Sequence, residues 1–217
     1  MSETPLTHSS APHKERLLWL VAIGFFMQTL DATILNTALP AMSQELGESP
    51  MKMQSVIVAY ALTTAMLIPA TGWVADRFGT RRIYGLAIGL FVLGSVLCAL
   101  SPSLPFLIAA RVVQGVGGAM MLPVGRLAVL RTYPRGEFIR AMSFIALPGP
   151  VGPLLGPTLG GWMVEYASWH WIFWINVPVG LIGLWATWRW FPQSAPLVVH
   201  RFDIKGYSML AFGMVAI

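Results

Sequence analysis

No charged residue occurs between Ala141 and Val164, and the middle of this run, residues 148–162, contains four prolines and five glycines. In a water-soluble helix, proline removes a backbone hydrogen bond and interior glycine costs about 1 kcal/mol, so this composition would normally indicate a loop. The flanks, however, are as apolar as a membrane span. Membrane helices tolerate proline because neighbouring helices and waters satisfy the freed carbonyl groups. This run therefore indicates a fold whose helices lie in lipid.

The composition also indicates a membrane protein. The 217-residue chain is 56% hydrophobic and 11% charged, whereas soluble domains carry about 25% charged residues. Lipid must therefore be the solvent for much of the chain, because too few charged groups are present to cover a globular surface. Six runs of about 20 mostly apolar residues predict complete helical spans. The predicted spans cover residues 17–39, 53–75, 83–100, 105–131, 139–165 and 170–190.

The basic residues predict how the spans cross the membrane. If the N-terminus is cytoplasmic, the outer side of the membrane receives only Lys52, and the basic residues gather on the inner side as the positive-inside rule requires. This asymmetry explains the net charge of +5 without a nucleic-acid partner and predicts a multi-pass protein of the cytoplasmic (inner) membrane. The inner basic residues are Lys14, Arg16, Arg77, Arg81, Arg82, Arg131, Arg135, Arg140, Arg189, Arg201 and Lys205.

Two opposite charges fall inside the spans at similar depths. At 1.5 Å per residue, Asp31 lies about 12 Å from the outer end of the first span, and Arg111 about 9 Å from the outer end of the fourth. Ionisable groups in membrane helices usually face the bundle interior or an aqueous cavity and mark a functional path. We predict that the two approach within a shared cavity and that the protonation of Asp31 depends on its distance from Arg111. The alternative is a static ion pair that orients two helices.

Uncharged polar residues near these charges are candidates for lining a cavity or for hydrogen bonding between helices. They are Gln28, Thr33, Asn36 and Gln114. The single Cys98 and the scattered histidines show no metal-ligand spacing, and no set of nucleophile, base and orienting group is visible. The sequence therefore predicts no metal site, no catalytic residues and no enzyme.

The loop after the second span, residues 72–82, reads GWVADRFGTRR. We expect Gly72 to allow a close helix approach, Gly79 to allow a tight turn and Asp76 to pair with an arginine at the cytoplasmic helix ends. The loop resembles the signature G-x-L-A-D-[KR]-x-G-[KR]-[KR] of the major facilitator superfamily, where it acts as a conformational latch. The matching residues are Gly72, Asp76, Arg77, Gly79, Arg81 and Arg82.

Two further stretches resemble signatures of the same family. Residues 107–120, LIAARVVQGVGGAM, are similar to its second signature, and the resemblance implies that Arg111 takes part in proton coupling. Residues 30–40, LDATILNTALP, resemble the signature of the fourteen-helix drug:proton antiporter branch, in which Asp31 occupies the acidic position.

The proline- and glycine-rich run supplies a fourth resemblance. Residues 152–161, GPLLGPTLGG, are similar to the antiporter signature G-x-x-x-G-P-x-x-G-G. Glycines four residues apart leave one helix face nearly bare, so another helix can approach closely. We expect a kinked helix that packs tightly and can rock. The matching residues are Gly152, Gly156, Pro157, Gly160 and Gly161.

The resemblance implies an all-α membrane fold, in which residues 17–190 form a six-helix N-terminal half built from two three-helix repeats. Residues 1–16 would be a cytoplasmic tail, residues 191–205 a linker, and residues 206–217 the truncated start of a seventh helix. A missing C-terminal half would be the partner of this chain.

The implied function is proton-coupled efflux of small, amphipathic or cationic molecules by alternating access, driven by the proton motive force without a cofactor. A solute:proton symporter of the same fold and a fragment that cannot transport alone are the alternatives. A seven-helix receptor is disfavoured by the cytoplasmic N-terminus and the latch-like loop, and a membrane enzyme by the absence of a catalytic set.

Overall fold

The computed structural model describes residues 11–193 and 202–215. Residues 1–10 of the predicted tail, residues 194–201 of the predicted linker and residues 216–217 lie outside the described residues. Every element in the described part is a helix. The helices are α1 (Ala11–Leu46), α2 (Pro50–Phe78), α3 (Thr80–Ala99), α4 (Leu104–Thr132), α5 (Arg135–Ala146), α6 (Pro148–Tyr166), α7 (Trp171–Trp174), α8 (Asn176–Trp190) and α9 (Ile204–Val215).

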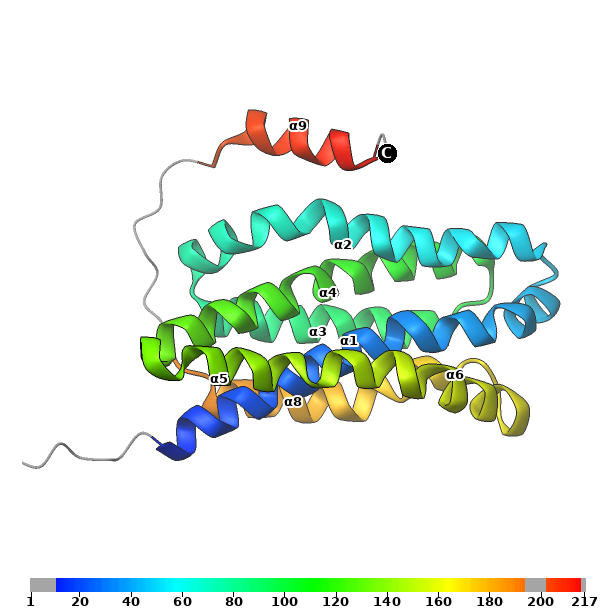
Figure 1. Cartoon of the computed structure of the whole chain (residues 1–217). Helices are drawn as coiled ribbons and strands as arrows, with labels where there is room; N and C mark the ends of the chain where they lie inside the picture. The colour runs from blue at the N-terminus through cyan, green and yellow to red at the C-terminus, as the bar shows by residue number, and fades with distance from the viewer. Residues whose placement is uncertain (1–10, 194–201, 216–217) are drawn as a thin grey trace, which may run out of the picture.

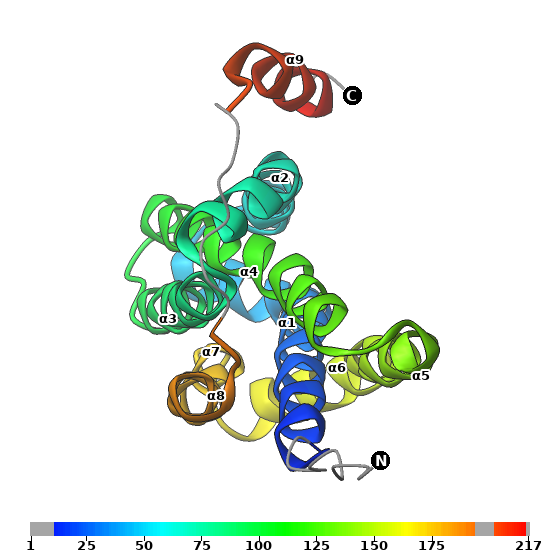
Figure 2. The ribbon, with the colours of Figure 1, turned by 90° about the vertical axis from the view of Figure 1, so that its left-hand side faces the viewer.

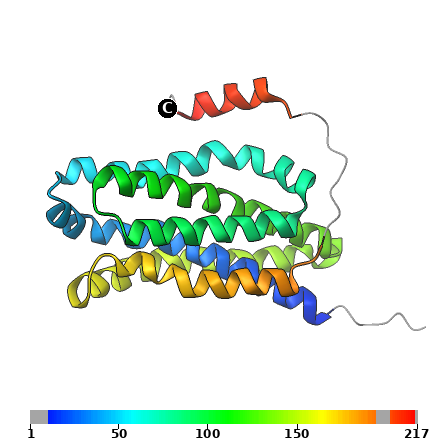
Figure 3. The same cartoon turned by 180° about the vertical axis from the view of Figure 1, so that it is seen from behind.

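The predicted all-α membrane fold is confirmed, because six helical segments of the described chain are long and apolar enough to cross a membrane. α5 and α6 together form the fifth segment, and α7 and α8 form the sixth. The long helices run side by side along one direction, as Figure 1 and the view from behind in Figure 3 show. The chain is therefore a multi-pass membrane protein.

The pairing of helices places α1 and α4 in the middle of the bundle. α4 packs against α2 and α3, whereas α1 packs against α6 and α8. Figure 2, which looks along the bundle, shows α2 and α8 on opposite sides of this central pair. α9 lies beyond α2 (Figure 2), where the hydroxyl of Tyr207 donates a hydrogen bond to the carbonyl of Met66 at 3.0 Å.

The first helix is longer than the predicted span of residues 17–39, because α1 continues through Pro40 and ends at Leu46. The continuation lies at the end of the bundle opposite the N-terminus, where the indole nitrogen of Trp169 donates a hydrogen bond to the Glu45 carboxylate at 2.7 Å. Gly47 then ends the helix with a φ of 65°, a conformation that glycine adopts without steric cost. A membrane helix tolerates an interior proline because neighbouring helices and local adjustments satisfy the freed carbonyl group.

The fifth segment is interrupted at Leu147, the residue between α5 and α6. Leu147 itself keeps helical angles, with φ −54° and ψ −43°, so the interruption lies in the hydrogen bonding, because the following Pro148 has no backbone N–H to donate to the preceding turn. Pro153 and Pro157 lie inside α6, which continues past both of them. The break thus falls at the start of the proline-rich run and not within it.

The buried apolar side chains form two clusters along the bundle. The first contains Leu17, Phe91 and Val124 among others, and the second contains Ile34, Leu107 and Phe173. On α1, α3, α4 and the α7–α8 segment, five of the buried polar residues fall between the two clusters in sequence. These residues are Asp31, Ser95, Arg111, Gln114 and Asn176.

Gly79 makes the turn between α2 and α3, with a φ of 89° and its N–H bonded to the carbonyl of Ala75 at 2.9 Å. Gly79→Ala is expected to lower the free energy of unfolding by about 1–3 kcal/mol, because a side chain is strained at this φ. Gly72→Ala is the matched control, since its added methyl meets no atom within 4 Å. Denaturation with sodium dodecyl sulfate, monitored by circular dichroism, measures the free energy of unfolding of both variants. Equal losses of this free energy in the two variants would contradict the prediction.

Candidate functional site

Asp31 of α1 and Arg111 of α4 form an ion pair in the middle of the bundle. The Arg111 Nη1 lies 2.6 Å from the Asp31 Oδ2, and each side chain is 1% exposed. The two residues that the depth argument selected are therefore in direct contact. The surroundings differ from the shared cavity that we expected, because both side chains are buried within the described helices.

Three uncharged side chains complete a hydrogen-bonded network around Asp31. The amide nitrogens of Gln114 and Asn176 donate to the Asp31 Oδ1 at 2.9 and 3.0 Å. The same nitrogens lie 2.8 and 3.4 Å from the hydroxyl of Ser95, and the Gln114 oxygen accepts from Arg111 at 2.6 Å. The Asp31 carboxylate thus receives three donors, which come from α4 and α8.

Arg111 is held by further groups that do not depend on Asp31. Its guanidinium carbon lies 4.3 Å from the ring centre of Tyr60 and 5.9 Å from that of Phe173. Its Nε donates to the carbonyl of Val56 at 3.4 Å. Aromatic faces attract a desolvated cation. We infer that the guanidinium would keep its position if Asp31 became neutral.

Sequence reasoning missed Ser95 and Asn176. Both are polar residues inside apolar spans, and both are buried. The depth argument that selected Asp31 would have selected Asn176 too, since an amide in lipid also needs partners. Ser95 gives a weaker signal, because a serine in a membrane helix can bond its own backbone.

The four residues predicted to line a cavity do not all lie at one site. Gln114 joins the ion pair, as described above. The hydroxyl of Thr33 lies against α6, 3.3 Å from the carbonyl of Gly152. Asn36 is exposed and its amide lies 3.5 Å from the carbonyl of Ala32. Gln28 is half-buried on α1.

The latch-like loop connects four helices at the end of the bundle that carries the N-terminus. Asp76 forms an ion pair with Arg131 at the end of α4. The Arg77 guanidinium lies 5.2 Å from the ring centre of Trp73, and that of Arg81 lies 5.6 Å from the ring centre of Trp188 on α8. The matching residue Arg82 is exposed.

Gly72 does not have the role that we expected from the loop. It is exposed, and a methyl group added there would meet no atom within 4 Å. The close helix approach predicted for this glycine is therefore absent within the described residues. The tight turn at Gly79 is present.

The glycine-rich motif of α6 divides into two faces. Gly152, Gly156 and Gly160 are buried against α1, where an added side chain would meet a regular row of threonines. The facing residues are Thr29, Thr33 and Thr37. Pro157 and Gly161 are exposed on the other face, and a methyl group at Gly161 would meet nothing within 4 Å. The spacing of four residues thus forms the seam between α1 and α6.

Within residues 11–193 and 202–215, no group of three or more histidine, cysteine, aspartate or glutamate side chains could hold a metal ion. Cys98 is buried, with its sulfur 3.8 Å from the Gln114 oxygen.

Comparisons with known proteins identify relatives of the chain. The family described as "Major Facilitator Superfamily" matches residues 21–205. Proteins named multidrug resistance protein MdtD are similar: one from Pectobacterium carotovorum subsp. carotovorum (strain PC1) is 58% identical over 200 residues, covering 92% of this chain and 43% of the relative. One from Cronobacter sakazakii (strain ATCC BAA-894) is 59% identical over 200 residues, covering 92% and 42%. The chain therefore spans less than half the length of these relatives.

Solved structures show the same fold. The chain resembles the proton:xylose symporter XylE bound to 6-bromo-6-deoxy-D-glucose, with a TM-score of 0.74 at 16% identity, covering 94% of this chain and 49% of the symporter. It also resembles a mutant of the peptide transporter POT in complex with alafosfalin, with a TM-score of 0.73 at 18% identity, covering 92% and 44%. At these identities, the likeness concerns the fold alone.

Proposed function

The chain belongs to the Major Facilitator Superfamily, and from this membership we propose that it is one half of a proton-coupled efflux antiporter for small amphipathic or cationic molecules. It acts as a carrier and not as an enzyme, in the cytoplasmic (inner) membrane with its N-terminus in the cytoplasm. The observation that carries the proposal is the buried ion pair of Asp31 and Arg111. The multidrug resistance names of its relatives support an export function.

Proton binding at Asp31 would change how the helices are held together. The ionised carboxylate accepts three hydrogen bonds from α4 and α8. Hydrogen bonds to a charged acceptor are about twice as strong as neutral ones, so a proton on Asp31 weakens all three at once. Arg111 stays with its aromatic neighbours and Val56. A proton therefore loosens α1 from α4 and α8, whereas its release tightens them.

Transport would also need a second half. Substrate sites in this kind of carrier lie between two halves, and access alternates as one half rocks against the other. The α1–α6 seam keeps two helices of this half together during such a movement, because the buried glycines leave no gap between them. The loop around Asp76 would act as a latch at the cytoplasmic end.

Inside-out membrane vesicles test the proposed function. The chain is joined to the C-terminal half of the Cronobacter sakazakii relative, and the vesicles are energised so that protons accumulate inside. Adding ethidium, an amphipathic cation, is expected to release protons with the joined protein and not with the 217-residue chain alone. Asp31→Asn in the joined protein is expected to abolish the release. Ethidium-induced release that persists in Asp31→Asn, or no release at all, would contradict the proposal.

A further inference from the structure

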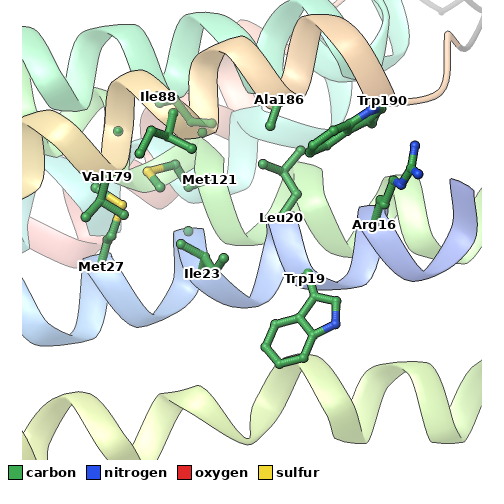
Figure 4. A pocket seen from close by; sticks show the side chains of 14 residues that line it. Arg16, Trp19, Leu20, Ile23, Met27, Ile88, Met121, Val179, Ala186 and Trp190 are labelled. Carbon is green, nitrogen blue, oxygen red and sulfur yellow. The ribbon is translucent and has the colours of Figure 1, made fainter. Parts of the chain in front are cut away.

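A groove of about 340 Å³ lies between α1 and α8. This volume is within the range of about 300–1,000 Å³ typical of ligand pockets. The groove is lined almost entirely by apolar side chains, and α3 and α4 form its floor (Figure 4). The residues that define its walls and floor are Leu20, Ile23, Val179, Gly183, Ile88 and Met121.

One end of the groove carries a positive charge. Arg16 lines it near the start of α1, and Figure 4 shows Arg16 and Trp190 together at this end. The Arg16 guanidinium carbon lies 5.1 Å from the ring centre of Trp190. Among the ion pairs of the described residues none involves Arg16, and the side chain is exposed. Its hydrogen-bond donors are therefore available to an anion.

The other end of the groove reaches into the bundle. Met27, Val179 and Ile88 lie there, away from Arg16 (Figure 4). Met27 is one turn before Asp31 on α1, so the groove extends from the membrane surface towards the middle of the bundle. A ligand that fits must be long, apolar along its length and negative at one end.

The groove opens to the lipid. Ile23 and Ile182 line it and are 42% and 66% exposed. Exposed apolar side chains of a membrane helix contact lipid chains. Figure 2 shows α8 and the start of α1 on the side of the bundle opposite α2 and α9. Lipid molecules can therefore enter the groove from the bilayer without passing through the protein.

We propose that the groove binds one acyl chain of an anionic phospholipid whose phosphate is bonded by Arg16. Arginine presents a planar set of donors that matches a phosphate, and stacking on Trp190 holds it at the mouth. The proposed cytoplasmic N-terminus places this lipid in the cytoplasmic leaflet, where anionic lipids are found. The bound chain would fill the space between α1 and α8, the helices that provide Asp31 and Asn176.

Two variants separate the acyl-chain contact from the phosphate contact. Gly183→Leu fills the groove, and its first added carbon meets nothing closer than the Ile88 Cδ1 at 3.8 Å. Gly89→Leu is the matched control, because it too has open space and lies outside the groove. Arg16→Gln removes the charge, and Arg189→Gln, exposed at the same end of the bundle, controls for net charge. If Gly183→Leu fails to fold, Ile23→Trp at the mouth provides a second filling variant.

Photo-crosslinking in lipid nanodiscs tests the proposal with the 217-residue chain. Phosphatidylglycerol and phosphatidylcholine, each with a diazirine in the middle of one acyl chain, are compared, and mass spectrometry maps the labelled peptides. We expect phosphatidylglycerol to label the groove segments of α1 and α8 at least several-fold more than phosphatidylcholine. Gly183→Leu should abolish this labelling, Arg16→Gln should remove the preference between the two lipids, and both controls should behave as the unmodified chain.

Three results would overturn the proposal. Labelling spread evenly over the lipid-facing helices would show that the groove holds no particular lipid. Equal labelling by the two lipids would show that Arg16 does not select an anionic headgroup. Loss of groove labelling on addition of ethidium, with either lipid, would show that the groove is a cargo site. None of these results depends on whether the carrier exchanges protons.

Discussion

Asp31→Asn is expected to lower the free energy of unfolding of the 217-residue chain by about 3–5 kcal/mol, because removing one member of a buried ion pair leaves the other charge uncompensated. The remaining Arg111 is 1% exposed, and arginine does not lose its proton in proteins. The Asn side chain has nearly the same shape as Asp, so the loss measures the charge and not a cavity. Denaturation with sodium dodecyl sulfate, followed by circular dichroism, gives the value.

Arg111→Gln should cost less than Asp31→Asn, although it removes the larger side chain. The carboxyl group left behind can take up a proton and become neutral, whereas the guanidinium cannot. The double variant, Asp31→Asn with Arg111→Gln, should therefore lose less free energy of unfolding than Asp31→Asn alone. Asn36→Ala, an exposed change on the same helix, is the control and should stay within about 0.5 kcal/mol. A greater loss from Arg111→Gln than from Asp31→Asn would contradict this explanation.

The depth of the charged residues could be predicted from the sequence because a helix has a fixed rise per residue and charges in lipid are rare. The similar depths of Asp31 and Arg111 therefore predict that the two residues lie near each other. The depth of a residue gives no information on which way its side chain faces around the helix axis. Asn176 meets Asp31 and Ser95 because α8 packs against both α1 and α3. The positions of the spans in the sequence do not determine which helices are neighbours.

The end of α1 could not be predicted from the local sequence, because it involves a contact with a distant part of the chain. The first span was predicted to end at residue 39, yet α1 continues through Pro40 to Leu46, and Glu45 near its end meets Trp169, a residue far along the chain. The motif predicted the turn at Gly79, which has a positive φ, but it also predicted a close helix approach at Gly72, which is exposed. The number of membrane segments was predictable because it depends on apolar length alone, which needs no knowledge of neighbouring helices.

Gly156→Val is expected to lower the free energy of unfolding by about 1–3 kcal/mol, because the added atoms overpack the seam between α1 and α6. The first added carbon would lie 3.0 Å from the Thr33 Cβ and would also meet its hydroxyl. Gly161→Val is the matched control in the same helix and the same motif, since nothing lies within 4 Å of its added carbon. Equal losses at Gly156 and Gly161 would show that valine disturbs the helix itself and not the seam.

A second substitution on α1 distinguishes overpacking from other causes. Thr33→Ala removes the hydroxyl that faces Gly156, so it should recover part of the loss in Gly156→Val and none of any loss in Gly161→Val. Residues in direct contact show coupling energies of about 0.5–3 kcal/mol in double-mutant cycles. Because the Thr33 Cβ remains in place, recovery should be partial. Gly156→Val in the joined protein should also slow the transport of ethidium, provided that the variant folds. The valine pushes α1 and α6 apart, whereas the proposed rocking needs this half to move as one body.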